Sequence, residues 1–288
     1  MNNLEPGKVN RVNREQFFPG GKGVHVALGI KELGETPALL GFWGGESGRW
    51  IKNFCVKQGI SCYGPEIKTW NRTCLTFKTE NAWNETELLE TGPVVEESEL
   101  EEFRAEYRSL LKRCSAVCMC GSWPRSNENL DYNEFIKIAK SENKKTFVDC
   151  SGECLVNALA CHPYAVHINQ HEGYEIFHQS DPLQIARSLT RDCDLAAVTG
   201  GVDGLYLSNG GEVVHAVNRI EHVISAVGSG DCLMAGLAVA DFRNLSLMDT
   251  VKLSAACGTA NCLRDDLGMF YKKDADLLFQ QSEASHIS

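Results

Sequence analysis

Short runs that favour β-strands alternate with helical stretches along most of this 288-residue sequence, and this alternation restricts the possible folds. Strands joined through helices of this length form βαβ units, whose strands run parallel in a sheet covered on both faces. We predict strands at Ala38–Phe42, Ala116–Cys120, Thr146–Cys150, Tyr164–Ile168 and Leu195–Thr199. We predict helices at Val24–Leu33, Gly48–Gln58, Leu130–Glu142 and Pro182–Thr190. The sequence therefore indicates an α/β fold with a mainly parallel sheet, whose ligands bind beyond the carboxyl ends of the strands.

Two stretches interrupt this rhythm. Val9–Phe18 and Cys62–Leu89 have strand-like segments without an intervening helix, and we expect them to pair as a small β lid covering about residues 6–18 and 62–90. Leu205–Leu207 and Val213–Val217, joined around Asn209-Gly210-Gly211, predict a β-hairpin. Repeats, low-complexity tracts and linkers are absent, so we expect a single domain over residues 1–288 with a lid excursion.

Charge and cysteine content limit the class of protein. A formal net charge of -10 argues against general binding to nucleic acid or to an anionic membrane. The polar start and the lack of a long apolar run lead us to expect a cytoplasmic protein. The thirteen cysteines are scattered, which is typical of free thiols in a reducing compartment. A zinc site is an alternative, but its spacing matches no usual ligand pattern; its ligands would be Cys150, Cys154, Cys161 and His162.

The motif Gly228-Ser229-Gly230-Asp231 lies between an apolar run and the helical pattern 233–240. Small residues let a backbone approach a bound phosphate, and the amides and dipole of a helix start favour negative charge there. Asp231 in that first turn is suited to accept a proton from an attacking hydroxyl. This combination fits phosphoryl transfer to an alcohol. An ordinary helix N-cap is the alternative interpretation.

Three other loops have residues suited to a phosphate or a metal. Pro19-Gly20-Gly21-Lys22-Gly23 precedes the first predicted helix, so its amides point toward any bound ligand. Thr199-Gly200-Gly201-Val202-Asp203-Gly204 follows a strand and is a candidate backbone cradle for nucleotide phosphate. Asn169-Gln170-His171-Glu172 begins a helix after another strand, and a helix-capping sequence explains it equally well.

In this order the motifs resemble those of the ribokinase-like (PfkB) carbohydrate kinases, and most of all the 1-phosphofructokinase and tagatose-6-phosphate kinase branch. The resemblance spans nearly the whole chain. Besides the three loops and the Gly228–Asp231 motif, it rests on 6–12 (PGKVNRV), 40–45 (LGFWGG), 71–73 (NRT), 121–124 (GSWP) and 149–153 (DCSGE). Each piece alone is common, but the ordered set is specific to the family.

The resemblance implies a three-layer α/β/α domain, a β lid that often forms a dimer contact, and Mg-ATP-dependent phosphorylation of a sugar phosphate. It implies that Asp231 is the base and that the amides of Gly228, Ser229, Gly230 and Asp231 form the anion hole. The implied sugar-phosphate site comprises Gly20, Gly21, Lys22, Gly23, His25 and Arg72, with the Arg72 guanidinium gripping the existing phosphate. The implied ATP site comprises Thr199, Gly200, Gly201, Gly204, Gly258 and Asn261. Asn169 and Glu172 would organise Mg²⁺, mainly through water.

The chain departs from the family pattern at several positions. His25 and Cys74 stand where the family usually has Asn, His167 replaces a usual Lys, and Cys232 replaces a small residue. The family's opening strand and its sugar-binding Asp have no counterpart before Pro6-Gly7-Lys8. We therefore expect a chain shortened relative to a functional parent, with His25 as the first candidate for the sugar contact if no further residues precede it.

Because Asp231 and both glycine loops are present, we expect a working kinase that converts fructose 1-phosphate to fructose 1,6-bisphosphate. Tagatose 6-phosphate is the alternative substrate, since the two sugars present phosphate at opposite ends of a ketohexose. A catalytically silent sugar-phosphate-binding protein is the alternative of a different class, although a pure binder needs no base.

Overall fold

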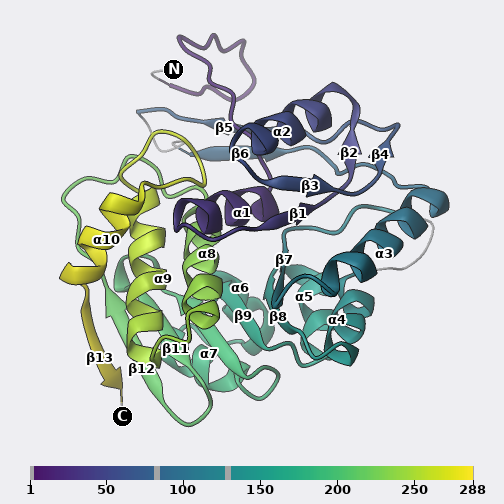
Figure 1. The fold of residues 1–288 in the computed structure, drawn as a ribbon. Coiled ribbons are helices and arrows are strands. Elements are labelled where there is room, and N and C mark those ends of the chain that lie inside the picture. The colour runs from purple at the N-terminus through teal and green to yellow at the C-terminus, as the bar shows by residue number, and fades with distance from the viewer. Residues whose placement is uncertain (1–2, 81–84, 127–130, 288) are drawn as a thin grey trace.

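The computed structural model describes residues 3–80, 85–126 and 131–287, which form layers of helices around a central sheet (Figure 1). Within these residues the largest sheet has seven strands in the order β13-β12-β11-β10-β9-β8-β7. Their bounds are β7 Ala116–Cys120, β8 Lys145–Asp149, β9 Ala165–Asn169, β10 Leu195–Thr199, β11 Leu205–Ser208, β12 Val213–Val217 and β13 Glu283–Ile287. β7 to β10 are parallel, and β11, β12 and β13 extend the sheet with antiparallel pairings. The predicted α/β class is confirmed.

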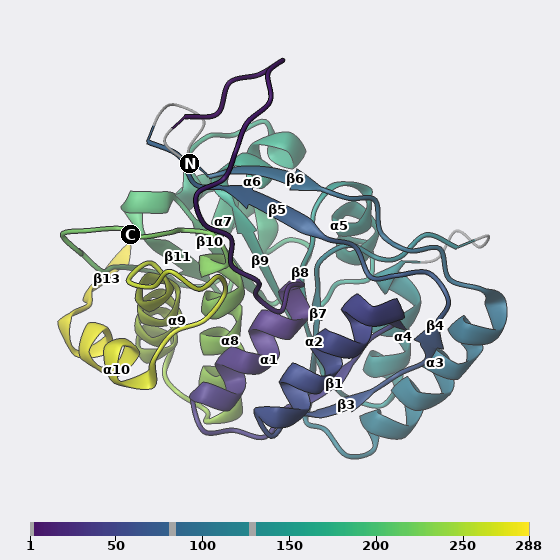
Figure 2. The ribbon, with the colours of Figure 1, turned by 90° about the horizontal axis from the view of Figure 1, so that it is seen from above.

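Helices cover both faces of this sheet. α1, α8 and α9 pack on one face, and α4, α5, α6 and α7 pack on the other (Figures 1 and 2). The helices are α1 Lys22–Glu32, α2 Gly45–Lys57, α3 Glu97–Leu111, α4 Tyr132–Ser141, α5 Gly152–Leu159, α6 Gln170–Phe177, α7 Pro182–Leu189, α8 Ser229–Phe242, α9 Leu247–Asn261 and α10 Lys272–Gln281. This is the three-layer arrangement expected of strands that are apolar on both sides.

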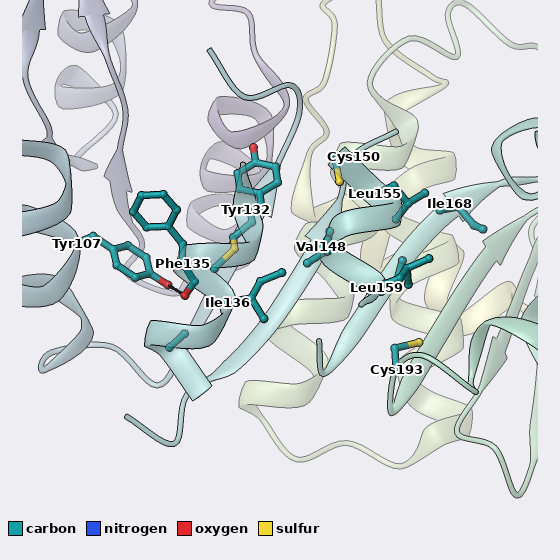
Figure 3. Packing of buried hydrophobic residues seen from close by; sticks show 14 of the residues in the cluster. Tyr107, Tyr132, Phe135, Ile136, Val148, Cys150, Leu155, Leu159, Ile168 and Cys193 are labelled. Carbon is teal, nitrogen blue, oxygen red and sulfur yellow. Dashed lines mark hydrogen bonds between the residues drawn. The ribbon is translucent and has the colours of Figure 1, made fainter. Parts of the chain in front are cut away.

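Neighbouring residues of one strand show how the two cores form. In β8, Phe147 belongs to the core beneath α8 and α9, whereas Val148 belongs to the core beneath α4, α5 and α7; both are fully buried. Successive side chains of a strand point to opposite faces, so an unbroken apolar run is needed here. Figure 3 shows part of the second core, where the Tyr107 hydroxyl donates to the Phe135 carbonyl at 2.9 Å. Burial of these strands fixes the sheet edge at which ligand-binding loops emerge.

The described residues also contain three two-stranded sheets. β1 (Ala38–Leu40) pairs with β3 (Ser61–Tyr63), and β2 (Trp43–Gly44) pairs with β4 (Glu66–Ile67), both in parallel. β5 (Cys74–Phe77) and β6 (Thr86–Leu89) form an antiparallel hairpin, as expected for the later lid segment. Figure 1 shows this hairpin at the top of the molecule, on the same side as the N-terminal coil.

The earlier lid segment differs from the expectation. Residues 9–18 form no strand, and Val9 and Phe17 are 87% and 76% exposed. Strand-like composition is insufficient here, because a strand requires a neighbouring ladder and these residues have none. The segment Cys62–Leu89 also divides, since β3 and β4 pair outside the hairpin.

Other boundaries follow from local chemistry. The helix expected at Leu130–Glu142 is α4, which the Asp131 side chain caps by accepting from the Asn133 amide; Leu130 lies outside the described residues. The predicted hairpin is β11–β12. α3 and β13 had no predicted counterpart. Among the described residues, helices long and apolar enough to cross a membrane are absent.

Candidate active site

The predicted loops meet at one edge of the large sheet. β8 ends at Asp149, β9 at Asn169 and β10 at Thr199, so these side chains lie at the carboxyl ends of three parallel strands. α1 packs beside β7, and α8 packs against β7, β8 and β9; Figure 2 shows these elements together. α1 and α8 each begin directly after a glycine turn, as the sequence indicated.

The glycines in the turn before α8 let neighbouring parts of the chain lie close to its backbone. Gly228 is left-handed (φ 84°), and a Cβ there would lie 2.4 Å from the Gly268 Cα, so only glycine fits. A Cβ on Gly230 would lie 2.9 Å from the His167 ring. The Ser229 amide donates within the turn to the Ala226 carbonyl, whereas the amides of Gly230 and Asp231 have no acceptor in the described chain. Two free amides at a helix N-terminus form an anion-binding site.

Asn261 and Gly258, which were expected to border a nucleotide, lie beneath this turn. Asn261 is fully buried and donates to the Val227 carbonyl and the Ser229 hydroxyl, each at 3.0 Å. Its oxygen accepts from the Met269 amide at 3.0 Å. A Cβ on Gly258 would lie 3.1 Å from the Ser229 carbonyl oxygen. Both residues therefore contact the turn directly, and Asn261 also joins it to the chain at Met269.

His25 is also placed differently from the expectation. Its Nδ1 lies 2.7 Å from Asp231 Oδ2, and its Nε2 lies 3.1 Å from the Pro19 carbonyl oxygen. Both ring nitrogens are thus occupied within the protein, and neither is free for a sugar hydroxyl. Asp231 is 5% exposed and sits at the start of α8 beside the free amides. A carboxylate in this position can accept a proton from a hydroxyl held next to the anion site.

Lys22, at the start of α1, reaches across the sheet edge to a buried carboxylate. Its Nζ lies 2.5 Å from Asp149 Oδ1, and the Lys22 stem packs near Gly121. Burial lowers the pKa of Lys22, but the negative charges of Asp149, Asp231 and Glu172 outweigh it and raise that pKa. Lys22 therefore stays positively charged and faces all three carboxylates of the site.

Asp149 and His167 are the residues that our sequence interpretation missed as partners. Asp149 is 1% exposed and also contacts His167, whose Nδ1 lies 3.1 Å from its Oδ2; His167 Nε2 lies 3.4 Å from the Thr199 hydroxyl. Burial raises the pKa of Asp149, but attraction to His167 and Lys22 prevails and lowers the pKa to about 2. An acid at the end of a predicted buried strand was the available signal, because such a charge needs a partner.

Asn169 and Glu172 form a helix cap. Asn169 Oδ1 accepts from the amides of His171 and Glu172, and Glu172 Oε2 accepts from the Asn169 amide at 2.8 Å. The capping alternative is therefore observed. Hard oxygen donors suit Mg²⁺, and Glu172 Oε1 has no hydrogen-bond donor among the described residues. Clusters of three or more His, Cys, Asp or Glu that could hold a metal are absent from the described ranges, including around Cys150 and Cys154. The pair thus fits Mg²⁺ held through water.

The remaining glycines divide into structural and open positions. A Cβ on Gly204 (φ 85°) would lie 2.3 Å from the Ala216 carbonyl oxygen, so the backbone pairing with β12 requires glycine. Gly201 (φ 62°) has open space around it, as do Gly20 and Gly23. The other positions of the two loops are Gly21, which caps α1, and Gly200, which precedes the 3₁₀ turn Gly201–Asp203.

Arg72 lies at the foot of the β5–β6 hairpin, half-buried, with Cys74 as its neighbour. Among the described residues it makes no ion pair, and it has no hydrogen bond to Asp231, Lys22 or His25. The hairpin itself is tied to the loops around α8: the Ser225 hydroxyl donates to Glu85 at 2.6 Å, and Lys78 lies 3.4 Å from Asp265. A guanidinium without a carboxylate is available to an anionic ligand.

Comparison with known proteins agrees with this architecture. A family model described as "pfkB family carbohydrate kinase" matches residues 2–269. A 1-phosphofructokinase of Bacillus subtilis is 27% identical over 91% of this chain and 87% of its own length. A tagatose-6-phosphate kinase of Staphylococcus epidermidis is also 27% identical, over 97% of this chain and 92% of its own length.

Solved structures share the fold. The crystal structure of phosphofructokinase-2 from Escherichia coli in complex with potassium has a TM-score of 0.86, with 21% identity over 97% of this chain and 93% of that one. The family match extends over most of the chain and includes every loop of the site. This chain belongs to the PfkB family of carbohydrate kinases.

Proposed function

We propose that this chain is an ATP-dependent kinase that phosphorylates fructose 1-phosphate to fructose 1,6-bisphosphate. The observation that carries the proposal is Asp231, a buried carboxylate beside the free amides of the α8 turn. This pairing supplies a base and an anion site within one helical turn, which is what phosphoryl transfer to a hydroxyl requires. The 1-phosphofructokinase of B. subtilis supports the choice of sugar.

In this proposal Asp231 removes the proton from the acceptor hydroxyl. The amides of Gly230 and Asp231, at the positive end of α8, stabilise charge on the transferred phosphoryl group. Lys22, charged and 39% exposed at its side chain, neutralises phosphate from the α1 side. Gly228 and Ser229 shape the turn, and Asn261 holds it through the Ser229 hydroxyl.

The nucleotide and its metal are assigned to the neighbouring strand ends. Thr199, Gly200, Gly201 and Gly204 form the turn that would hold the ATP phosphates, and Val202 in the same turn is 90% exposed. When bound, Mg²⁺ neutralises phosphate charge. Glu172 would hold it through water with its free oxygen, and Asn169 would orient Glu172 through the cap.

Arg72 is assigned to the phosphate already present on the sugar. Its support is the guanidinium without a carboxylate partner at the foot of the lid hairpin. The glycines 20, 21 and 23 lie on the other side of the sugar in this assignment. Tagatose 6-phosphate is the second candidate, because the tagatose-6-phosphate kinase relative is as similar as the 1-phosphofructokinase.

The test is a coupled assay of ADP release over a panel of fructose 1-phosphate, fructose 6-phosphate, tagatose 6-phosphate and unphosphorylated fructose. We expect the highest kcat/KM with fructose 1-phosphate. A higher value with tagatose 6-phosphate would transfer the assignment to that sugar. Binding of a sugar phosphate without ADP release would identify a silent binding protein and refute the kinase proposal.

Asp231→Asn is the matching variant. It should lower kcat by ~10²–10⁴-fold, the usual range for removal of a general base, while leaving ATP binding intact. Turnover and nucleotide binding are measured by ADP release and by calorimetry, and thermal unfolding serves as the folding control. Near wild-type turnover would remove Asp231 from the mechanism, and a large loss of melting temperature would favour a mainly capping role.

A homodimer formed through the lid is our proposal for the assembly. The hairpin exposes large apolar side chains, and the three most relevant are Leu75, Leu88 and Leu89, each more than half exposed. Apolar patches of this kind mark interaction surfaces. Sedimentation velocity of the wild type and of Leu88→Lys tests it, with dissociation of a dimer expected in the variant.

A cytoplasmic location is proposed from the thirteen free cysteines.

A further inference from the structure

Asp231 and His25 form a buried pair that joins α1 to α8. Asp231 Oδ2 lies 2.7 Å from His25 Nδ1, and the two residues are 5% and 8% exposed. On its far side the ring contacts the Pro19 carbonyl oxygen through Nε2, at 3.1 Å. A Cβ on Gly268 would lie 2.2–2.6 Å from atoms of the ring, so the backbone there presses against the imidazole and fixes its plane. His25 therefore has one orientation and two defined partners.

The two contacts determine how many protons the pair holds. A carbonyl oxygen only accepts, so the contact with Pro19 requires a proton on Nε2. A distance of 2.7 Å between Nδ1 and Oδ2 is a hydrogen bond and requires a second proton between those atoms. A neutral imidazole carries one proton, so a neutral ring beside an ionised Asp231 satisfies only one contact. The pair holds two protons, as imidazolium with carboxylate or as imidazole with carboxylic acid.

We propose that His25 is a positioning residue for Asp231, acting as an imidazolium that donates from Nδ1 to Oδ2. This inference deepens the proposed kinase function and rests on it. With Oδ2 held by His25, Oδ1 is the oxygen that accepts the proton of the sugar hydroxyl. The hydroxyl O–H bond breaks as the Oδ1–H bond forms, the freed electron pair attacks the γ-phosphorus, and ADP leaves with the electrons of the broken P–O bond. The carboxylic-acid form of the pair would leave no base.

The groups around the pair are consistent with this charge state. Lys22 on α1 faces Asp231, Asp149 and Glu172, so Lys22 and the His25 imidazolium together balance two of these three carboxylates before an anionic substrate binds. Cys120 on β7 and Cys232 on α8 also face Asp231; burial, followed by neighbouring charges that include Asp231, raises the pKa of both thiols, which stay neutral. Asp266, in the loop that contains Gly268, contributes to the raised pKa of Cys232 and forms an ion pair with Arg264.

Two substitutions distinguish a role of His25 in orienting Asp231 from a role in packing. His25→Asn places a neutral amide donor near the position of Nδ1, so it keeps a hydrogen bond to Asp231 but removes the positive charge. His25→Gln places its amide near the position of Nε2, so it keeps the contact with Pro19 and loses the contact with Asp231. We expect His25→Gln to lower kcat by about 10–100-fold, because a misplaced base loses its alignment with the hydroxyl. We expect His25→Asn to lower kcat less than His25→Gln does, because it keeps a hydrogen-bond donor to Asp231.

The protonation state has a direct readout that does not depend on turnover. In a ¹⁵N–¹H spectrum of the full chain at pH 7.5, where an ordinary histidine is neutral, wild-type His25 should show two protonated nitrogens. Asp231→Asn should shift its Nδ1 signal, and His286→Asn, on the exposed strand β13, serves as the control that leaves it unchanged. The signal is assigned by its loss in His25→Asn.

A neutral His25 in the wild-type spectrum overturns the proposal, as does a His25→Gln variant with wild-type kcat and pH profile. A His25→Asn variant that loses as much kcat as His25→Gln overturns it too. If no sugar phosphate is a substrate, the proposed function fails while the spectrum still decides the state of the pair.

Discussion

Replacement of Lys22 by Met leaves a buried carboxylate with one partner fewer. Asp149, which is 1% exposed, lies between the Lys22 ammonium at 2.5 Å and the His167 ring at 3.1 Å. Lys22→Met keeps an unbranched stem and removes only the charged end. Loss of one partner from a buried ion pair typically costs roughly 3–5 kcal/mol, because the remaining charge is left uncompensated. We therefore expect a strongly destabilised protein.

The lowered pKa of Asp149 gives a second measure of how strongly its partners stabilise the carboxylate. Its fall from 3.8 to about 2 corresponds to roughly 2 kcal/mol of net stabilisation of the carboxylate in the folded protein. Burial opposes that stabilisation, so the gross contribution of Lys22 and His167 is larger than the net figure, and the 3–5 kcal/mol range is consistent with it. In a domain of this size, that loss lowers the melting temperature by roughly 6–10 °C.

The assay is urea unfolding at pH 7, followed by the fluorescence of the five tryptophans. The double variant Lys22→Met/Asp149→Asn should recover most of the lost stability, because it removes the buried charge as well. It should stay inactive, since the cation near the phosphates is still missing. Lys68→Met is the matched control: Lys68 pairs with Glu96 at 3.0 Å on the surface, and its loss should leave the unfolding midpoint unchanged. A single variant as stable as the wild type, or a double variant less stable than the single, would refute the reasoning.

Three further outcomes are expected. Arg72→Ala should raise the KM for sugar phosphate by about 10–150-fold, the equivalent of roughly 1.5–3 kcal/mol, without changing the KM for ATP; an equal effect on both would show that Arg72 only supports the lid. Asn261→Leu should reduce both stability and kcat, because Ser229 and the Val227 carbonyl lose their buried donor; unchanged kcat in unfolding-corrected assays would contradict this. The folded-state pKa of Asp149 is lowered, so its contribution to stability is complete above about pH 3.8 and is lost as the pH falls toward 2; acid titration of Asp149→Asn should lack this component.

Local patterns were enough to predict the large sheet, but they could not identify side-chain partners. Ala116–Cys120 and Leu195–Thr199 have the predicted bounds, because a short apolar run bounded by turn residues is typical of a buried strand. Residues 9–18 contain strand-favouring Val and Phe but form no strand, because pairing depends on a distant neighbour. The pairs at the site join residues far apart in the chain: 127 positions separate Lys22 from Asp149, and 206 separate His25 from Asp231. Such pairs depend on where α1 and α8 lie relative to the sheet edge. The spacing of apolar residues along the sequence does not predict that.

The two ties between the lid hairpin and the loops around α8 connect the proposed sugar side of the site to its phosphoryl side. Glu85 accepts from Ser225, three residues before Gly228, and Lys78 pairs with Asp265, three residues before Gly268. These contacts join the hairpin to the loops in which Gly228 and Gly268 approach each other closely. Coupling free energy is reciprocal, so the factor by which the sugar phosphate changes ATP affinity equals the factor by which ATP changes sugar-phosphate affinity. Any such coupling between the hairpin and the α8 turn can pass through the Ser225–Glu85 and Lys78–Asp265 contacts.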